Sequence, residues 1–271
     1  MKPSATVKSS PVPRRLEVDA LIPEDWLKPS EDENPFTPAL IKLHKYGANN
    51  SKLCCTEKRG YATPDDLGPA ALVLDASEGF IPLWAIGRTL HYRFNELSMN
   101  YFQNRSKAKS AVLTLFAEAI LAWGDSAPIR FAENTDTYDF EIFMNRHDDG
   151  SDEEGYVLAS AFFPASGRDR LTLYPKMFEQ SRKEQVETLI HEIGHIFGLR
   201  HFFAVESEAT WPSVIFGTHS KFSIMNYGAD SILTDADKSD LVRLYEQVWS
   251  NSLKKINGTP IVQVKPYHDL L

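Results

Sequence analysis

Three histidines and one glutamate lie within eleven residues of an otherwise apolar stretch, TLIHEIGHIFGLRHFF, which runs from Thr188 to Phe203. His191 and His195 are four residues apart, so on a helix both imidazoles would lie on one face and could reach one ion. Zinc prefers tetrahedral coordination by nitrogen, and three protein ligands leave a fourth position for water. The pair therefore predicts two ligands of a zinc ion, presented by a helix.

A third ligand has to come from beyond that helix, because the helical stripe would carry further residues away from the ion. Gly198 follows His195 by three residues and tolerates a positive φ, so the chain can turn sharply there. His201 then has three residues in which to return to the metal. Glu192 is one residue from His191, so it is expected beside the metal but need not be a ligand, which suits a general base for the bound water.

The whole pattern from His191 to His201 rarely arises by chance. From the residue frequencies of this chain, three His, one Glu and one Gly at these spacings are expected on the order of once in tens of thousands of such chains. The segment matches H-E-x-x-H-x-x-G-x-x-H, and the chain therefore resembles the metzincin zinc endopeptidases. Metzincins carry a Met-containing turn beneath the zinc, and SIMNYG places Met225 24 residues after His201.

Further segments are similar to the catalytic domain of the matrixins, one family of metzincins. They are LHYRF, a helix that ends at Trp123, PIRF, DFEIFM and the closing LTDADKSDLVRLY, so the resemblance covers about residues 84 to 250. It implies an α+β, zincin-like fold: a twisted mixed sheet, mostly parallel with one antiparallel edge strand, with an active-site helix, a Met-turn and a C-terminal helix. A substrate peptide is then expected along the edge strand by β-augmentation. The candidate edge is ASAFFPA, from Ala159 to Ala165.

Hydrophobic periodicity predicts the elements that must position these residues. TLHYRF alternates like a strand, and SKAKSAVLTLFAEAILAW carries one apolar stripe at helical spacing. Ser181 and Glu184 form a capping box in front of the helix that carries His191 and His195. Thr234 is the expected N-cap of the last helix. Further strands are expected in PIRFAE, TYDFEIFMN, YVLASAFFP and DRLTLYP.

Composition divides the chain into three parts. Residues 1–80 are rich in Pro, Ser and charge, and are expected to form an N-terminal extension or prosegment-like arm with one short helix from Pro38 to Gly47. Residues 81–250 are expected to be the metzincin catalytic domain, and residues 251–271 a C-terminal tail. All the candidate site residues fall in the middle part.

Two positions depart from the matrixin pattern. Phe202 follows the third histidine, where matrixins usually have Ser or Thr. Tyr227 stands two residues after Met225, as in astacins and serralysins, where the tyrosine can reach the zinc and then stabilise the oxyanion of the transition state. The resemblance to those families makes Tyr227 a second catalytic candidate beside Glu192, with simple packing as the competing explanation.

The acidic loop HDDGSDEEG bears on further metals, because matrixins hold a structural zinc and calcium ions with such a loop. It contains His147, Asp148, Asp149 and Asp152, but Ser160 stands where the next histidine of the family would fall. One catalytic zinc is therefore the expected cofactor. Calcium would suit the carboxylates, although a solvated acidic loop explains them as well.

Cys54 and Cys55 are the two cysteines of the chain and precede the catalytic region. Matrixin zymogens block their zinc with a prosegment cysteine, and a thiolate can replace water as a zinc ligand. The surrounding family motif, P-R-C-G-x-P-D, is not present. Two inert cysteines on a terminal arm are therefore the favoured interpretation, and a latency switch is the alternative.

Charge and hydropathy exclude some partners. The net charge of -8 argues against nucleic-acid binding, which needs a basic face. No run reaches the roughly 18 apolar residues of a membrane helix, so no membrane span is predicted. The first residues, MKPSATVKSSPVPRR, carry charge without an apolar core, so no ordinary signal peptide is expected, which fits a cytoplasmic or non-classically exported protein. The sequence gives no indication of oligomeric state.

These observations together predict a zinc metalloendopeptidase that hydrolyses peptide bonds in a protein or peptide substrate, with Glu192 as general base. The alternative is a zinc-bearing interaction protein, or a latent zymogen, whose cleft is covered by residues 1–80. Glu192 favours the enzyme, because a binding module has no need of a base. An aminopeptidase-type metzincin is a third hypothesis. The segment FAVESEATWPSVIFGTHSK after His201 is expected to form the wall of the specificity pocket.

Overall fold

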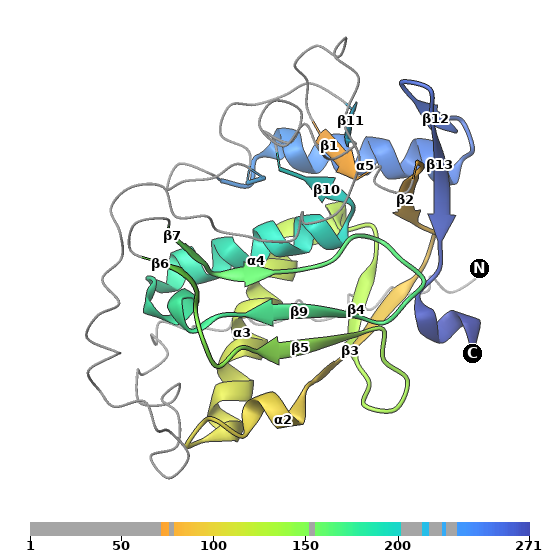
Figure 1. Ribbon diagram of the computed structural model, residues 1–271. Helices are drawn as coiled ribbons and strands as arrows, with labels where there is room; N and C mark the ends of the chain where they lie inside the picture. Colours follow the sequence, from red (N-terminus) through yellow and green to blue (C-terminus); the bar gives the residue numbers. More distant parts are fainter. Residues whose placement is uncertain (1–71, 76–78, 152–154, 202–212, 217–223, 226–231) are drawn as a thin grey trace, which may run out of the picture.

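The computed structural model describes residues 72–75, 79–151, 155–201, 213–216, 224–225 and 232–271 (Figure 1). Several sequence predictions lie outside these residues: the helix from Pro38 to Gly47, Cys54 and Cys55, Phe202 and Tyr227. Among the helices of the described part, none is long and apolar enough to cross a membrane.

The largest sheet of the described residues has five strands: β3 (Thr89–Phe94), β4 (Arg130–Glu133), β5 (Phe140–Met144), β8 (Ala159–Ser160) and β9 (Asp169–Leu173). Their order is β4-β3-β5-β9-β8. β3 pairs in parallel with β4 and β5, and β5 pairs in parallel with β9, whereas β8 runs antiparallel to β9 at the edge. The predicted mixed sheet with one antiparallel edge strand is therefore confirmed.

The edge of this sheet is shorter than the sequence predicts. Only Ala159 and Ser160 pair with β9, so the expected strand over Ala159 to Ala165 ends after two residues. Upstream, β7 (Gly155–Val157) pairs instead with β6 (Asp149–Ser151) in a separate ribbon. Downstream, Phe162 is buried in the core and its ring packs on Phe140 at 5.2 Å between centroids, so this part of the chain leaves the sheet.

Two long helices form the core with this sheet. They are α3 (Arg105–Trp123) and α4 (Arg182–Ile196), and they lie side by side (Figure 1). α3 connects β3 to β4, and a helical crossover of this kind is what allows two neighbouring strands to run parallel. The predicted apolar stripe of α3 is buried except for the half-buried Ile120, and Phe116 packs edge-on against Phe140 and Phe131 of the sheet.

Side-chain caps start two helices where the sequence predicts them. The Ser181 side chain accepts from the Glu184 backbone and the Glu184 side chain accepts from the Ser181 backbone, which forms the capping box of α4. Thr234 and Asp237 form a second box in front of the last helix, α5 (Asp235–Trp249). The shorter helices are α2 (Glu96–Met99), η3 (Gly124–Ser126), η4 (Pro175–Glu179) and η6 (Tyr267–Leu270).

A small sheet near the end of α4 was not predicted from the sequence. It joins three segments that are far apart in the chain: β1 (Leu72–Asp75), β10 (Leu199–Arg200) and β11 (Ser213–Phe216). Their order is β10-β1-β11, and β1 runs antiparallel to both neighbours. β1 belongs to the predicted N-terminal arm, so part of that arm pairs with the region around the third histidine.

The C-terminal residues also form regular structure. β12 (Lys255–Ile256) and β13 (Thr259–Val264) make a hairpin, and β13 pairs in parallel with β2 (Ile81–Trp84). Asn257 and Gly258 connect the hairpin with φ values of 48° and 85°, as the two central residues of a type I′ turn require. Residues 255–264 therefore pair with the scaffold of the catalytic region.

Candidate active site

The three histidines of the motif meet at the C-terminal part of α4. His191 and His195 lie one turn apart on the helix, and His201 directly follows β10. The Nε2 atom of His201 is 3.1 Å from Nε2 of His191 and 3.2 Å from Nε2 of His195. All three residues are buried. The structure thus brings the three predicted ligands together through the same ring nitrogen.

Backbone carbonyls fix the orientation of two of these rings. The Nδ1 atom of His191 lies 2.7 Å from the Ile224 carbonyl oxygen, and Nδ1 of His195 lies 2.6 Å from the Leu199 carbonyl oxygen. A carbonyl oxygen can only accept a hydrogen bond, so each Nδ1 carries the proton and donates. The lone pair of each neutral ring is therefore on Nε2, which is the atom that faces the other histidines.

The spacing of the three nitrogens fits a zinc ion. Zinc binds histidine nitrogen at about 2.0 to 2.1 Å, which places tetrahedral ligand atoms about 3.4 Å apart. The observed separations of 3.1 and 3.2 Å are close to that value. His191, His195 and His201 also form one of the groups of side chains in the described residues that could hold a metal ion. A three-histidine set leaves a fourth position for water or substrate.

Burial favours the neutral form of His195 and His201 by lowering the pKa of each ring. The loss of hydration on burial is the main reason that the pKa of His195 is lowered to about 3. The positive charge of Arg200 also lowers this pKa, whereas the hydrogen bond to the Leu199 backbone raises it. The same loss of hydration lowers the pKa of His201 well below its ordinary value, with added repulsion from the other two histidines and Arg200. The rings can therefore bind a cation near neutral pH without first losing a proton.

Glu192 and Met225 complete the predicted set within the described residues. Glu192 follows His191 on α4 and is wholly buried. Met225 is buried beneath the same helix, where a Cβ built on Gly194 would approach its sulfur to 2.5 Å. A larger residue would force the Met225 side chain to shift, and the same Cβ position lies 3.5 Å from the Trp123 ring. The expectation that a Met-containing turn lies under the helix agrees with this packing.

Three supports of the site were missed by sequence reasoning. The Ile224 carbonyl orients His191, so the Met-turn contacts a predicted ligand directly. Trp84 Nε1 donates to the Ile196 carbonyl at 2.6 Å, and the Tyr245 hydroxyl donates to the Phe197 carbonyl at 3.0 Å. These two donors satisfy carbonyls at the end of α4 that lack helical partners. Trp84 and Tyr245 are distant in sequence, so no local pattern identifies them.

The turn after α4 brings His201 back to the ion position. Gly198 has a φ of 93°, and a side chain there would meet Leu83 at 3.0 Å, so both the backbone and the close approach of β2 require glycine. This agrees with the turn that the sequence predicts at this residue.

Comparison with known proteins identifies the family. A family model described as Matrixin matches residues 84–226, just over half of the chain. The chain belongs to the matrixin family. Matrixins are zinc metallopeptidases, so membership makes the chain a hydrolase of that class, with protein or peptide as substrate. The match includes the three histidines, Glu192 and Met225, and it ends one residue before Tyr227.

Two solved structures are similar to this matrixin chain. One is a structure of myroilysin that is 16% identical in sequence to this chain, with a TM-score of 0.40; the match covers 64% of this chain and 98% of the myroilysin chain. The other is a crystal structure of myroilysin that is 14% identical, with a TM-score of 0.40; the match covers 78% of this chain and 96% of the myroilysin chain. Similarity at this level adds nothing on function. Among curated proteins, no significant match was found.

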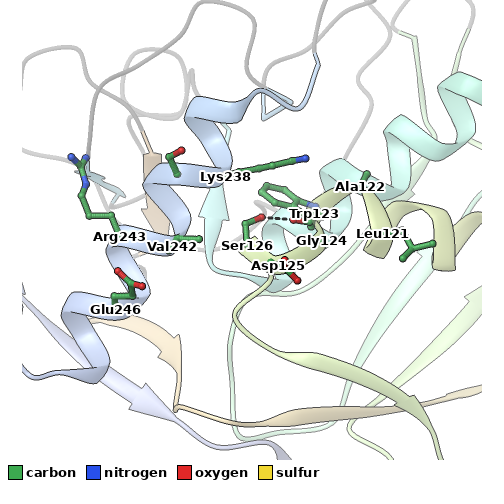
Figure 2. A pocket seen from close by; sticks show the side chains of 11 residues that line it. Leu121, Ala122, Trp123, Gly124, Asp125, Ser126, Lys238, Val242, Arg243 and Glu246 are labelled. Atoms are coloured by element: carbon green, nitrogen blue, oxygen red, sulfur yellow. Dashed lines mark hydrogen bonds between the residues drawn. The ribbon is translucent and has the colours of Figure 1, made fainter. Parts of the chain in front are cut away.

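A surface groove elsewhere on the matrixin fold does not coincide with the histidines. It has a volume of about 520 Å³ and lies between the C-terminal end of α3, with η3, and one face of α5 (Figure 2). Lys238, Arg243 and Glu246 of α5 line one side, and Leu121 and Asp125 line the other. None of the three histidines or Glu192 lines it, so the groove is not the candidate active site.

Proposed function

We propose that this matrixin is a zinc-dependent endopeptidase in which His191, His195 and His201 hold the metal and Glu192 is the general base. The observation that carries the proposal is the convergence of the three Nε2 atoms, with separations of 3.1 and 3.2 Å between them. The Nδ1 hydrogen bonds of His191 and His195 support it, because they direct the lone pairs toward a common point.

The chemistry needs a nucleophilic water and a group to move its proton. When bound, zinc supplies a Lewis acid that polarises the scissile carbonyl and lowers the pKa of a water ligand toward ~7. Glu192 accepts a proton from the attacking water and passes it to the leaving amine, which breaks the peptide bond into a carboxylate and an amine. Its place beside His191 and its complete burial suit a base that works in a water-poor site.

Tyr227 is proposed to stabilise the oxyanion that develops on the attacked carbonyl. Support comes from its position two residues after Met225, which packs under the metal-binding helix. A Tyr227→Phe variant removes the phenolic donor while keeping the ring. It is expected to lower kcat by about tenfold to a thousandfold with zinc content unchanged, whereas an unchanged kcat would remove Tyr227 from the mechanism.

The substrate is proposed to bind as an extended peptide along β8. This strand is the antiparallel edge of the five-stranded sheet, and among the described residues β9 is the one strand that pairs with it, so its other side could take a further strand. Phe163 follows the strand closely and its half-buried ring lies 5.5 Å, centroid to centroid, from the ring of His195. A peptide on this edge would therefore pass beside the metal ligands. A main chain bound in this way favours cleavage within a chain rather than at its end.

The test is to measure metal content and casein cleavage for the wild type and Glu192→Gln side by side. Glu187→Gln is a matched control, because Glu187 lies on the same helix, partly exposed and paired with Lys183. The proposal expects one zinc per chain in all three proteins, and cleavage by the wild type and Glu187→Gln alone. Cleavage by Glu192→Gln at the wild-type rate would refute the role of the base.

The same assay addresses the latent forms that the sequence leaves open. One zinc per chain with no cleavage by the wild type would favour a covered cleft or a binding role over a free enzyme. Removal of residues before Leu72 would then separate the two, since only a zymogen gains activity when its cover is lost.

A further inference from the structure

The strand β1 lies between β10, which directly precedes the third histidine, and β11, which follows later in the chain. β10 ends at Arg200, directly before His201, and β11 lies further along the path toward Met225. In the sheet order β10-β1-β11, each of these segments pairs with β1, and they do not pair with one another. The backbone of the chain around His201 is therefore held by a strand from upstream of the catalytic region.

One pair of residues links this strand to the metal ligands. Leu74 of β1 pairs with Leu199 of β10, and both side chains are fully buried. The carbonyl oxygen of Leu199 accepts the 2.6 Å hydrogen bond from Nδ1 of His195. The next residue but one is His201. The pairing of β1 with β10 thus fixes the backbone that orients one ligand and carries another.

The strand also belongs to the scaffold beneath the site. β1 contacts α5 and β2, the two elements that supply Tyr245 and Trp84 to the end of α4. The match to the matrixin model begins at Trp84, so β1 lies outside the part that the family model covers. The support of the candidate metal centre by β1 therefore rests on the contacts of this chain and not on the family match.

We propose that β1 is a positioning element of the metal centre, and that Leu74 acts through Leu199 on His195 and His201. The inference rests on the proposed zinc site. It divides the predicted N-terminal arm, because residues 72–75 are needed for the site, whatever residues 1–71 do. Removal of residues 1–75 should therefore weaken zinc binding, and an active form made by N-terminal trimming should still contain Leu72.

The experiment uses the full-length chain with Leu74→Ala, and with Leu90→Ala as a matched control. Leu90 is also fully buried, but it lies on β3 in the five-stranded sheet. Zinc affinity is measured by competition with a chromophoric chelator, and the Tm of the metal-free protein is measured in parallel. Leu74→Ala is expected to raise the Kd for zinc by at least about tenfold, the usual effect of disturbing groups that orient a ligand. Leu90→Ala should lower the Tm with less than about a twofold change in Kd.

A milder pair, Leu74→Val and Leu90→Val, serves if either alanine variant fails to fold. A third variant, Val73→Pro, disturbs the central strand through its backbone, because proline removes one ladder hydrogen bond. It should also raise the Kd for zinc.

The outcomes separate this inference from the proposed function. Equal changes in Kd for the Leu74 and Leu90 variants would reduce β1 to a general contributor to stability and overturn the inference. An unchanged Kd in the Leu74 variants would overturn it as well, while the zinc site of the wild type would stand. A wild type that takes up no zinc would overturn the metal centre itself, and the positioning role with it.

Discussion

His191, His195 and His201 form one cluster of metal-binding residue types in this protein, and His91, Asp139 and His268 form another. Both bring three such side chains within 4.8 Å of one another. They differ in what their nitrogen and oxygen atoms already bind. In the first cluster, the Nδ1 atoms of His191 and His195 are bound to backbone carbonyls, which leaves Nε2 to face the shared centre.

In the second cluster, the carboxylate is already engaged by donors from the protein. Asp139 accepts from the backbone N–H of His91 at 2.7 Å, from the backbone N–H of His268 at 2.9 Å, and from Nδ1 of His268 at 2.8 Å. The rings of His91 and His268 stack at 3.9 Å with 21° between their planes. Lone pairs lie in the ring planes, so those of two nearly parallel stacked rings do not meet at one point.

The second cluster therefore works as a clamp. Asp139 precedes β5, and its carboxylate joins β3, through His91, to η6 near the C-terminus, through His268. Residue types and proximity are therefore not sufficient to predict a metal site. We expect the ion at the first cluster because the Nε2 atoms of its three histidines face a common centre.

The largest effect is expected from His195→Ala, with His268→Ala as its counterpart. Loss of His195 removes one of three ligands, so zinc content should fall from one per chain to nearly none, and peptidase activity by more than about a thousandfold. His268→Ala should keep one zinc per chain. Elemental analysis of the dialysed proteins measures both. Loss of zinc from the His268 variant would show that the clamp is a metal site after all.

Asp139→Ala should have the next largest effect, on stability rather than on zinc. The change leaves two backbone N–H groups and one imidazole without their acceptor, at a cost of about 2 to 4 kcal/mol in the free energy of unfolding. Chemical denaturation of the metal-free protein measures this cost. Asp139→Asn keeps part of the acceptor set and should lose less. Equal stability of the wild type and Asp139→Ala would contradict the clamp.

Gly194→Ala tests the floor under the first cluster. Its new Cβ would lie 2.5 Å from the sulfur of Met225, and the overlap should reduce stability by about 1 to 3 kcal/mol. Combining it with Met225→Ala should cost less than the sum of the two single changes, because the shorter side chain removes the overlap. Additive costs in thermal denaturation would show that the two residues do not press on each other.

The smallest effect is expected from His91→Phe. Phenylalanine keeps the ring that stacks on His268 and loses the 3.0 Å hydrogen bond of Nδ1 to the Thr137 carbonyl, which is exposed. The change should cost no more than about 1 kcal/mol and leave zinc content unaltered. If His91 were a metal ligand, His91→Phe would instead lower the measured metal content, because phenylalanine cannot bind a metal ion.

Much of the first cluster could be predicted from the sequence, since residue spacing carries strong local information. The positions of His191 and His195 on one helix face, the glycine turn at Gly198 and the capping box at Ser181 all follow from short-range rules. The strand over residues 89–94 and the last helix were also predicted, because their apolar periodicity is clear over several residues.

Contacts between distant segments could not be predicted in this way. β1 pairs with a strand that lies more than a hundred residues further along the chain, and Asp139 joins His91 to His268. Such pairings depend on tertiary packing, which leaves no periodic trace in a single sequence. The edge strand was predicted too long for the same reason, because Phe162 turns toward Phe140 in the core instead of continuing the ladder.

The most direct test of the account is a crystal structure of the zinc-loaded protein with anomalous diffraction data collected at the zinc edge. The account predicts one strong peak at about 2.0 to 2.1 Å from the Nε2 atoms of His191, His195 and His201, and no peak beside the stacked rings of His91 and His268. A peak at the second cluster, or none at the first, would contradict it.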